Sequence, residues 1–570
     1  MVIKPDDNDG NFNHMLRLRV NCGDTKIANF ISKSDKNATY VSKTIQNDLL
    51  TIISNRIIAN IVACVNKSSC WCVIADETTD RAKREQLVIV LRYVSETDCG
   101  FVVKEDPIRL IDLFSNARQE ISNVDDEVRL DGELIATAIL QKIADCNLQL
   151  SQLVGQGYDK AATMASESVG VAAVIKSAAP LADYFHCASH ATNLSCSKCL
   201  TVRIIRDAHD AICETINTIN HSAKRVDLLK QQLQAYESSS TKRLLTVCTT
   251  RFVERHEAIG RFWDIFPAVI RTLERMERWK DYDSRTKANQ LLACLSKSET
   301  IIGLVCLKYI SSVMKPLASA LQQPNSDIST ALELVNATAT LMERCRREAD
   351  AEFNVLFTEA VKMAESLSVA IRKPRHSSIS RHRSNVGGAD TSPEEHYRLN
   401  CFVPMLDAII LDFQQRFAKH TSIACYLQNL IPFRAKNARW EDISPAYENY
   451  SSLLAGSSDD VKAEFYVWQK YCKNLTDISA IETLNVCNRR IFPNIFLLIR
   501  IFATLPITTC EAERLFSKVE RTLTALRSTM SEDRLEDLII IQAHRDALPN
   551  TDEIIDLFAA SKTRKLPFVL

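Results

Sequence analysis

Glycine and proline are scarce in this chain of 570 residues, which holds only 12 glycines and 15 prolines. So few turn-forming residues argue against a sandwich of many short strands and favour long helices. An excess of either charge is also missing, because 70 basic residues balance 70 acidic ones. This balance gives no support for nucleic-acid binding by the chain as a whole, although acidic helices elsewhere can offset a basic groove.

Targeting and membrane signals are also missing from the sequence. The first residues, MVIKPDDNDGNFNHML, contain no apolar segment of the secretory kind. No run of about 18 apolar residues without a charge occurs, so we expect no membrane span. The 19 cysteines are odd in number and scattered, which is typical of reduced, buried thiols and not of a disulfide framework.

Short apolar runs and amphipathic segments alternate over the first third of the chain. Their periods predict, in order, a helix, three strands, a helix, a strand, a helix and a last short strand, over 40–66, 71–76, 86–94, 100–113, 131–147, 150–159, 160–177 and 183–190. Three consecutive strands predict an antiparallel meander, and strands that each follow a helix predict parallel additions. This order matches an α/β, RNase H-like fold.

The remainder of the chain has an almost wholly helical pattern. Helices are expected over 202–235, 255–278, 288–322, 328–370, 401–418, 491–504, 509–526 and 532–546, and an exposed loop over 372–396. We therefore divide the chain into a helical N-terminal segment, the first part of the α/β core, a helical insertion, a C-terminal region with the last core helix, and a tail, over 1–66, 67–200, 201–490, 491–548 and 549–570.

Two aspartates close predicted strands: Asp76 ends the first strand and Asp159 the fourth. Carboxylates at neighbouring strand ends are suited to hold Mg²⁺ or Mn²⁺ for displacement at phosphorus. Turn chemistry is the alternative use of aspartate at a strand end, and on spacing alone it is the more frequent one. The nearby carboxylates Glu77 and Asp80 are expected on a solvated turn.

Glutamates flank the apolar face of the predicted helix 509–526. Glu511 lies on one flank and Glu513 on the other, so periodicity does not choose between them. Thr508-x-x-Glu511 is a capping-box pattern, which gives Glu511 a structural task.

Several blocks, in order, resemble hAT-superfamily transposases: IADETTDRAKREQLVIVLRYV (74–94), GQGYDKAATMA (155–165), YFHCASHATNL (184–194) and LPITTCEAERLFSKVERTLTALRSTMSEDRLEDLIIIQAHRD (505–546). The resemblance runs from about residue 10 to 546. It implies an RNase H-like (retroviral-integrase-like) core split by a helical insertion. It also implies that Asp76, Asp159 and Glu513 form a catalytic, metal-binding triad with Mg²⁺ or Mn²⁺, because Glu513, and not Glu511, matches the family motif.

The same resemblance implies residues that contact DNA. Cys187-x-x-His190 matches a family element near the active site. Arg251 and Phe252 stand where the family has Arg-Trp. A phenyl ring can still stack on a base, but it lacks the indole N–H. A buried aromatic at a helix start is the alternative for Phe252.

Further basic and cysteine residues have both a functional and an ordinary interpretation. Arg372, Lys373 and Arg375 of the basic loop are candidates for phosphate contacts, with a solvated loop as the alternative. Cys196 and Cys199 follow the Cys-x-x-His element, and four soft ligands suit zinc. The short spacing and helical pattern favour core cysteines over a zinc site.

Two functions follow from the resemblance. The first is a transposase that cleaves and joins DNA in the nucleus and assembles as a homodimer or higher oligomer through its C-terminal region. The second is a domesticated, non-enzymatic regulator that dimerises. Leu535, Leu538 and Ile539 are candidates for the dimer contact, with intramolecular core as the alternative. No zinc finger precedes residue 10, so we expect this chain alone to bind transposon ends poorly.

Overall fold

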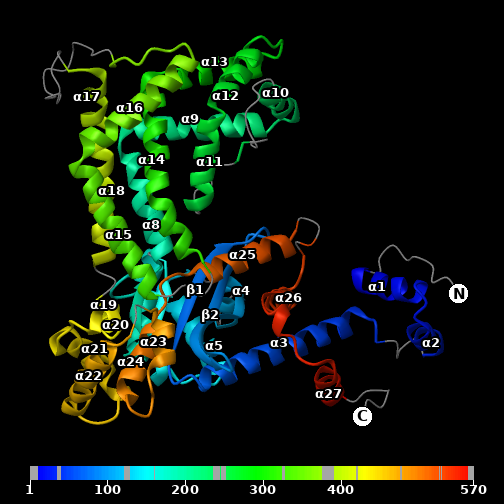
Figure 1. Ribbon diagram of the computed structural model, residues 1–570. Helices are drawn as coiled ribbons and strands as arrows, with labels where there is room; N and C mark the ends of the chain where they lie inside the picture. The colour runs from blue at the N-terminus through cyan, green and yellow to red at the C-terminus, as the bar shows by residue number, and fades with distance from the viewer. Residues whose placement is uncertain are drawn as a thin grey trace.

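The computed structural model describes residues 10–34, 40–120, 129–159, 161–234, 244–245, 252–323, 328–374, 391–418, 422–475, 478–524, 527 and 529–562. Figure 1 shows an α/β body that carries a tall column of helices, a helical lobe beside the foot of the column, and an N-terminal arm that projects away from both.

A five-stranded mixed sheet forms the centre of the body. Its strands are β1 (Trp71–Thr79), β2 (Glu85–Thr97), β3 (Gly100–Asp112), β4 (Leu153–Tyr158) and β5 (Asp183–His186). They lie in the order β3-β2-β1-β4-β5, with β1, β2 and β3 antiparallel in succession and β1, β4 and β5 parallel. The meander and the parallel additions that the sequence predicts are both present.

Helices make up the rest of the structure and fall into four groups. The arm consists of α1 (Gly10–Asn21), α2 (Thr25–Lys33) and the start of α3 (Lys43–Asn66). The body adds α4 (Leu113–Glu120), α5 (Gly132–Asp145), α6 (Ala162–Ala165), α7 (Val171–Ala178), α24 (Pro493–Thr504), α25 (Cys510–Thr522), α26 (Glu532–Ala543) and α27 (Thr551–Ser561). The column holds α8 (Ala188–Ser197), α9 (Arg203–Asn220), α10 (Ala223–Gln234), α11 (Phe252–Asp264), α12 (Phe266–Glu277), α13 (Tyr282–Leu295), α14 (Ser298–Leu321), α15 (Ile328–Arg347), α16 (Ala349–Ser366), α17 (Pro393–Tyr397) and α18 (Val403–Ala418). The lobe holds α19 (Ser422–Gln428), α20 (Pro432–Ala435), α21 (Ser444–Tyr450), α22 (Ser458–Cys472) and α23 (Ala480–Val486).

The long helical runs expected from periodicity are mostly pairs of helices. The run 202–235 is α9 and α10, and the run 328–370 is α15 and α16. A tight turn of one or two residues barely disturbs the apolar period, so the period alone does not show the break. The expected insertion 201–490 is likewise divided, because its last part forms the lobe and not the column (Figure 1).

The two faces of the sheet are buried under different helices. Val73 and Ala75 of β1 pack with α3, α5 and α7, whereas Ile74 packs against Leu515 of α25. Successive side chains of a strand alternate between faces. Asp76 therefore belongs to the face that α25 covers.

Two helices among the described residues, α3 and α14, are long and apolar enough to cross a membrane by length and composition alone. In α14, 67% of the apolar stretch is buried inside the protein, as befits a core helix. In α3 the buried share is 28%, and the helix packs against β2, α26 and α27.

Candidate active site at the ends of β1 and β4

The pairing of β1 with β4 brings Asp76 and Asp159 together. Asp159 directly follows β4 as expected, but the expectation that Asp76 ends its strand is wrong, because β1 continues to Thr79. Ile74 pairs with Gly157 in the parallel ladder, and Asp76 and Asp159 each lie two residues further along their strands. Parallel strands advance together, so the two aspartates leave the same end of the sheet side by side. The carboxylate of Asp76 accepts the Glu77 amide at 3.0 Å, and that of Asp159 accepts the Ala161 amide at 3.0 Å.

Two glycines in β4 allow close approach of the connector, the segment between α24 and α25. A Cβ atom on Gly157 would lie 3.0 Å from the Cβ of Pro506, and one on Gly155 would lie 3.1 Å from the Cδ of Pro506. The segment between α24 and α25 therefore rests directly on the strand. Sequence reasoning missed this contact, although glycine inside a strand signals close backbone approach.

A buried arginine fixes the end of α24, just before this connector. Arg92 of β2 donates from Nε to the carbonyl oxygen of Thr504 and from a terminal nitrogen to that of Ala503, both at 3.1 Å. Its other terminal nitrogen pairs with Glu105 at 2.5 Å, and both side chains are almost fully buried. A cation at a helix C-terminus satisfies carbonyl groups that have no partner within the helix. The direction in which the chain leaves α24 is thereby set.

Cys187, at the start of α8, binds the start of α25. Its sulfur accepts the amide of Thr509 at 3.3 Å and that of His190 at 3.4 Å. Burial, and then the charge of Glu513, raises the pKa of the Cys187 thiol to about 11. The thiol is therefore neutral near pH 7 and acts as an acceptor that joins α8 to α25.

The third carboxylate, Glu513, reaches the aspartates from α25. Burial raises the pKa of Asp76 well above its usual range, and the charges of Glu513 and then Asp159 raise it further. Burial, and then Asp159, also raises the pKa of Glu77. Electrostatic coupling of this kind requires the carboxylates to lie close together. The three residues that the sequence selects are therefore neighbours in space.

Glu511, the alternative glutamate, is engaged elsewhere. It forms an ion pair with Arg514, which also donates to the carbonyl oxygen of Gln322 at 2.7 Å. The predicted capping box is wrong, because α25 begins at Cys510 with Thr509 as its N-cap and no side-chain cap bond. Glu511 therefore pairs with Arg514, which is itself bound to the end of the column, and does not cap α25.

The donor set suits a hard divalent cation. Three carboxylates that repel one another are stabilised when a cation neutralises them, and carboxylate oxygen is the ligand that Mg²⁺ and Mn²⁺ prefer. Within the described residues, no three His, Cys, Asp or Glu side chains converge closely enough to form a ready metal-holding group. The carboxylates are neighbours, and a cation that binds all three would have to pull their oxygens closer together.

Comparison with known proteins connects this geometry to a family. A family model described as "ZMYM1/FAM200, RNase-like domain" matches residues 3–170, and one described as "hAT family C-terminal dimerisation region" matches residues 462–544. The chain is therefore similar to a ZMYM1/FAM200 RNase-like domain in its N-terminal part and to the dimerisation region of the hAT family in its C-terminal part. The "52 kDa repressor of the inhibitor of the protein kinase" of Homo sapiens is 23% identical over 97% of this chain and 72% of its own length. The protein of the same name from Mus musculus is 22% identical over the same shares.

His190, in the Cys-x-x-His element, lies beside the carboxylates. Burial lowers its pKa, while the charge of Asp159 raises it and that of Arg416 lowers it. Its ring meets the His186 ring edge-on at 5.9 Å between centroids. Cys196 and Cys199, expected as core cysteines, are indeed buried among the helices of the column.

The described candidates of the basic loop, Arg372 and Lys373, are not at this site. Arg372 donates its amide to Ser298 at the start of α14, and Lys373 contacts the Thr391 carbonyl. Helix α14 has 24 residues, so its two ends lie roughly 36 Å apart, and its far end touches α25 through Cys510. Arg372 and Lys373 therefore lie about the length of α14 away from the carboxylates.

The remaining candidates lie at the edge of the described residues or outside them. Arg251 and Arg375 are outside, and Phe252 is the first residue of α11, with its side chain outside the described part of the chain. The expectation that Glu77 and Asp80 lie on a solvated turn is wrong. Glu77 is a half-buried residue of β1 that pairs with Leu87. Asp80 is 7% exposed, and its carboxylate accepts the amides of Ala82 at 2.7 Å and Arg84 at 3.0 Å.

Proposed function

We propose that this chain has an RNase H-like core and cleaves and joins DNA with Asp76, Asp159 and Glu513. The observation that carries the proposal is the parallel pairing of β1 with β4, which puts Asp76 beside Asp159 on the face that α25 covers. The raised pKa of Asp76, caused by burial and then by Glu513 and Asp159, agrees with this placement. A sheet of this strand order, the RNase-like family model over 3–170 and the hAT region over 462–544 support it.

The three carboxylates would hold Mg²⁺ or Mn²⁺, which activates an attacking hydroxyl and stabilises the leaving oxygen in an in-line displacement at phosphorus. Asp76 and Asp159 are rigid ligands because Asp76 lies within β1, Asp159 directly follows β4, and a backbone amide donates to each carboxylate. The Tyr184 hydroxyl further anchors the Asp159 backbone by donating to its carbonyl oxygen at 2.7 Å. Glu513 is the adjustable member, since it comes from a helix that the connector and Cys187 hold.

Binding of Mn²⁺ tests the site without knowledge of the DNA target. Calorimetric titration of the full chain should show Mn²⁺ binding that Asp76→Asn and Glu513→Gln each weaken by about ten- to a hundredfold. Glu511→Gln is the matched control on the same helix and should bind as the wild type does. Equal binding by all four proteins would refute the site.

Excision tests the reaction itself. The wild-type chain and Asp76→Ala should be compared on an element that carries the terminal inverted repeats flanking the native gene. We expect excision with the wild type alone. Equal excision by both proteins, or excision by neither, would refute the proposal that this chain is an enzyme.

A domesticated regulator is the second candidate function. The name of the human relative, a repressor of an inhibitor of a protein kinase, favours it. Such a protein would work in the nucleus as a dimer bound to DNA or to another protein. Retained dimerisation together with absent Mn²⁺ binding and absent excision would support this candidate over the transposase.

A further inference from the structure

Exposed apolar side chains are unevenly distributed in the dimerisation region, residues 462–544. Among its described residues, the large apolar side chains that are exposed are Tyr466, Val467, Tyr471, Val486 and Ile491. All of them precede α24, and three of them belong to α22.

The later helices of the region use their apolar residues within the chain. Leu515 of α25 and Leu535 and Ile539 of α26 are buried against the sheet. The sequence left two interpretations open for Leu535, Leu538 and Ile539. Intramolecular core is the one found for Leu535 and Ile539, whereas Leu538 is half-buried and is not a member of that cluster. Leu535 and Ile539 are therefore not available for a dimer contact.

Helix α22 has one face held by the lobe and one face open. Phe465 and Trp468 are fully buried, and the Trp468 indole donates to the carbonyl oxygen of Leu430 at 2.9 Å. The opposite face exposes Asp459, Ala463, Tyr466, Val467, Lys470 and Tyr471. Residues 459, 463, 466 and 470 are spaced by four, three and four, which is the spacing of a seam between paired helices.

The exposed face of α22 carries an acidic residue near its start and a basic residue near its end, so it is complementary to a second copy that runs antiparallel. Asp459 lies in the first turn of α22 and Lys470 in the last, 11 residues or about 16 Å apart. If a second α22 lies antiparallel across a two-fold axis, Asp459 faces Lys470 of the partner subunit, and Ala463 faces Tyr466 of the partner subunit. Both pairs are centred on the same point of the helix, between Glu464 and Phe465. A surface that matches itself in this way is what a two-fold dimer requires.

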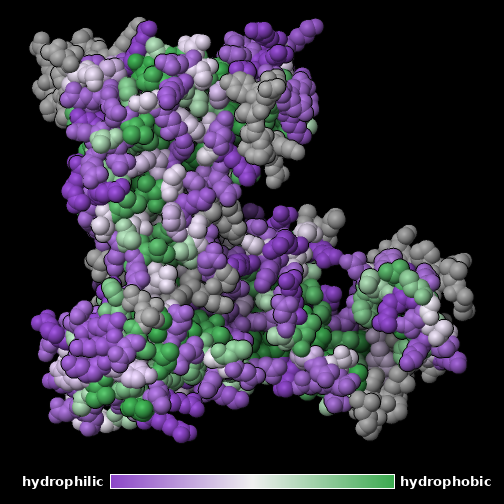
Figure 2. Space-filling view, in the orientation of Figure 1, coloured by the Kyte–Doolittle hydropathy of each residue, from purple (hydrophilic) through white to green (hydrophobic). Residues whose placement is uncertain are grey.

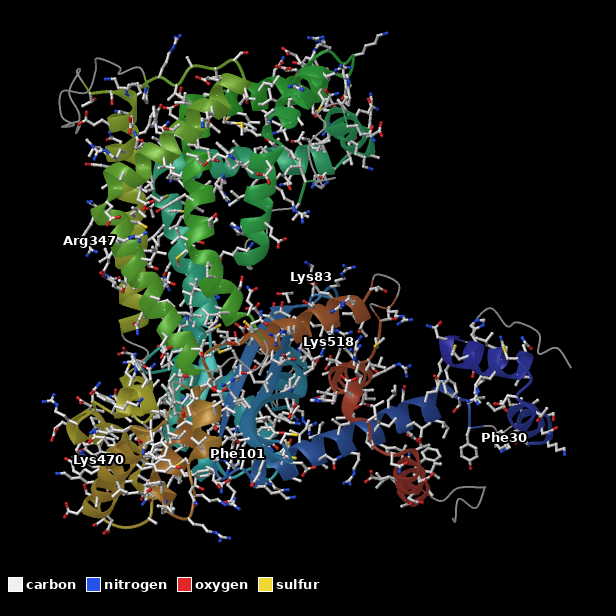
Figure 3. The ribbon with its side chains drawn as sticks, viewed as in Figure 1. Phe30, Lys83, Phe101, Arg347, Lys470 and Lys518 are labelled. Atoms are coloured by element: carbon white, nitrogen blue, oxygen red, sulfur yellow. The ribbon has the colours of Figure 1, made fainter. Side chains whose placement is uncertain are left out.

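We propose that α22 pairs antiparallel with α22 of a second copy of this chain, in an assignment that rests on the proposed dimerisation. Tyr466 and Val467 form the centre of the contact, and the Asp459–Lys470 pairs close its two ends. Figure 3 places Lys470 on the lobe, at the lower left, and Figure 2 shows hydrophobic atoms among hydrophilic ones on the same lobe.

The contact is small. A helix of 15 residues is about 22 Å long and its face about 10 Å wide, so each copy buries roughly 200–300 Å² through this face, against about 800 Å² in a standard interface. Dissociation in the micromolar range is therefore expected.

Sedimentation velocity of the full chain across the micromolar range tests the proposal. Val467→Asp should weaken dimerisation at least about tenfold, because it places a charge at the centre of the contact. Lys470→Asp should weaken it less, and the double variant Asp459→Lys with Lys470→Asp should restore it. Val355→Asp is the matched control, since Val355 is 68% exposed on α16, outside the region.

Each outcome decides something. Dimerisation that Val467→Asp leaves unchanged overturns the α22 interface and leaves the proposed dimerisation standing. A wild-type chain that stays monomeric at every concentration overturns both. Restoration by the charge-swapped double variant supports the antiparallel register and also shows that the loss in Lys470→Asp is not misfolding.

Discussion

Replacement of Asp76 by Asn should stabilise the metal-free protein. Asn keeps an oxygen that can accept the Glu77 amide, now received by Asp76 at 3.0 Å, but it removes a buried charge that repels Glu513 and Asp159. Two like charges roughly 6 Å apart at an effective dielectric constant of about 20 repel by on the order of 3 kcal/mol. A buried acid relieves part of this repulsion by binding a proton. We therefore expect a gain of about 1–3 kcal/mol in the free energy of unfolding near pH 7.

The gain should depend on pH in a defined direction. The pKa of Asp76 is raised in the folded state, mainly by burial and then by Glu513 and Asp159. Its contribution to stability is therefore fully present below the unfolded pKa of about 3.9 and is lost as the pH rises through the folded pKa. The advantage of Asp76→Asn should vanish near that acidic limit and grow toward neutral pH.

Thermal melting with and without Mn²⁺ measures both effects. A change of about 1–3 kcal/mol corresponds to roughly 2–10 °C for the transition that melts the sheet. At the same concentration, Mn²⁺ should raise the melting temperature of the wild type more than that of Asp76→Asn. Asp80→Ala is the contrasting control in the same hairpin, because it removes the acceptor of two backbone amides and should cost about 1–3 kcal/mol. If Asp76→Asn melts below the wild type in metal-free buffer at pH 7, the inferred repulsion between the carboxylates is wrong.

Other substitutions test how α25 is held. Gly157→Ala places a Cβ 3.0 Å from Pro506 and should destabilise by about 1–3 kcal/mol in urea unfolding; a neutral result would mean that the connector shifts freely. Arg92→Met leaves the Glu105 carboxylate buried and unpaired and should cost about 3–5 kcal/mol, most of it recovered by adding Glu105→Gln; additive losses would contradict this pairing. Cys187→Val removes the acceptor of two amides and should speed hydrogen exchange at the start of α25, whereas unchanged exchange would exclude the sulfur as an anchor.

The periods in the sequence identify the strands and most helices because they report which side chains are buried locally. The continuous apolar, β-branched run over 86–94 and the extended segment over 100–113 are enough to place β2 and β3, and the order of elements is enough to suggest their directions. The short turns between consecutive helices, such as the one between α9 and α10, are not predicted because they hardly change the spacing of the apolar residues. The solvated position expected for Asp80 is wrong for a related reason: its role depends on the amides of a tight turn, which no period reveals.

The sequence by itself determined most of the elements, the family resemblance and the choice of Asp76 and Asp159 as candidates on two strands, since these follow from residues close together in the chain. It left Glu511 and Glu513 equal on the helix and chose between them only by motif. The tertiary structure decided the rest, because the choice depends on contacts between residues hundreds of positions apart. Three contacts orient α25 so that Glu513 lies near Asp76: Arg92 binds the end of α24, the connector packs on Gly157, and Cys187 accepts an amide at the start of α25. Glu511 is instead paired with Arg514.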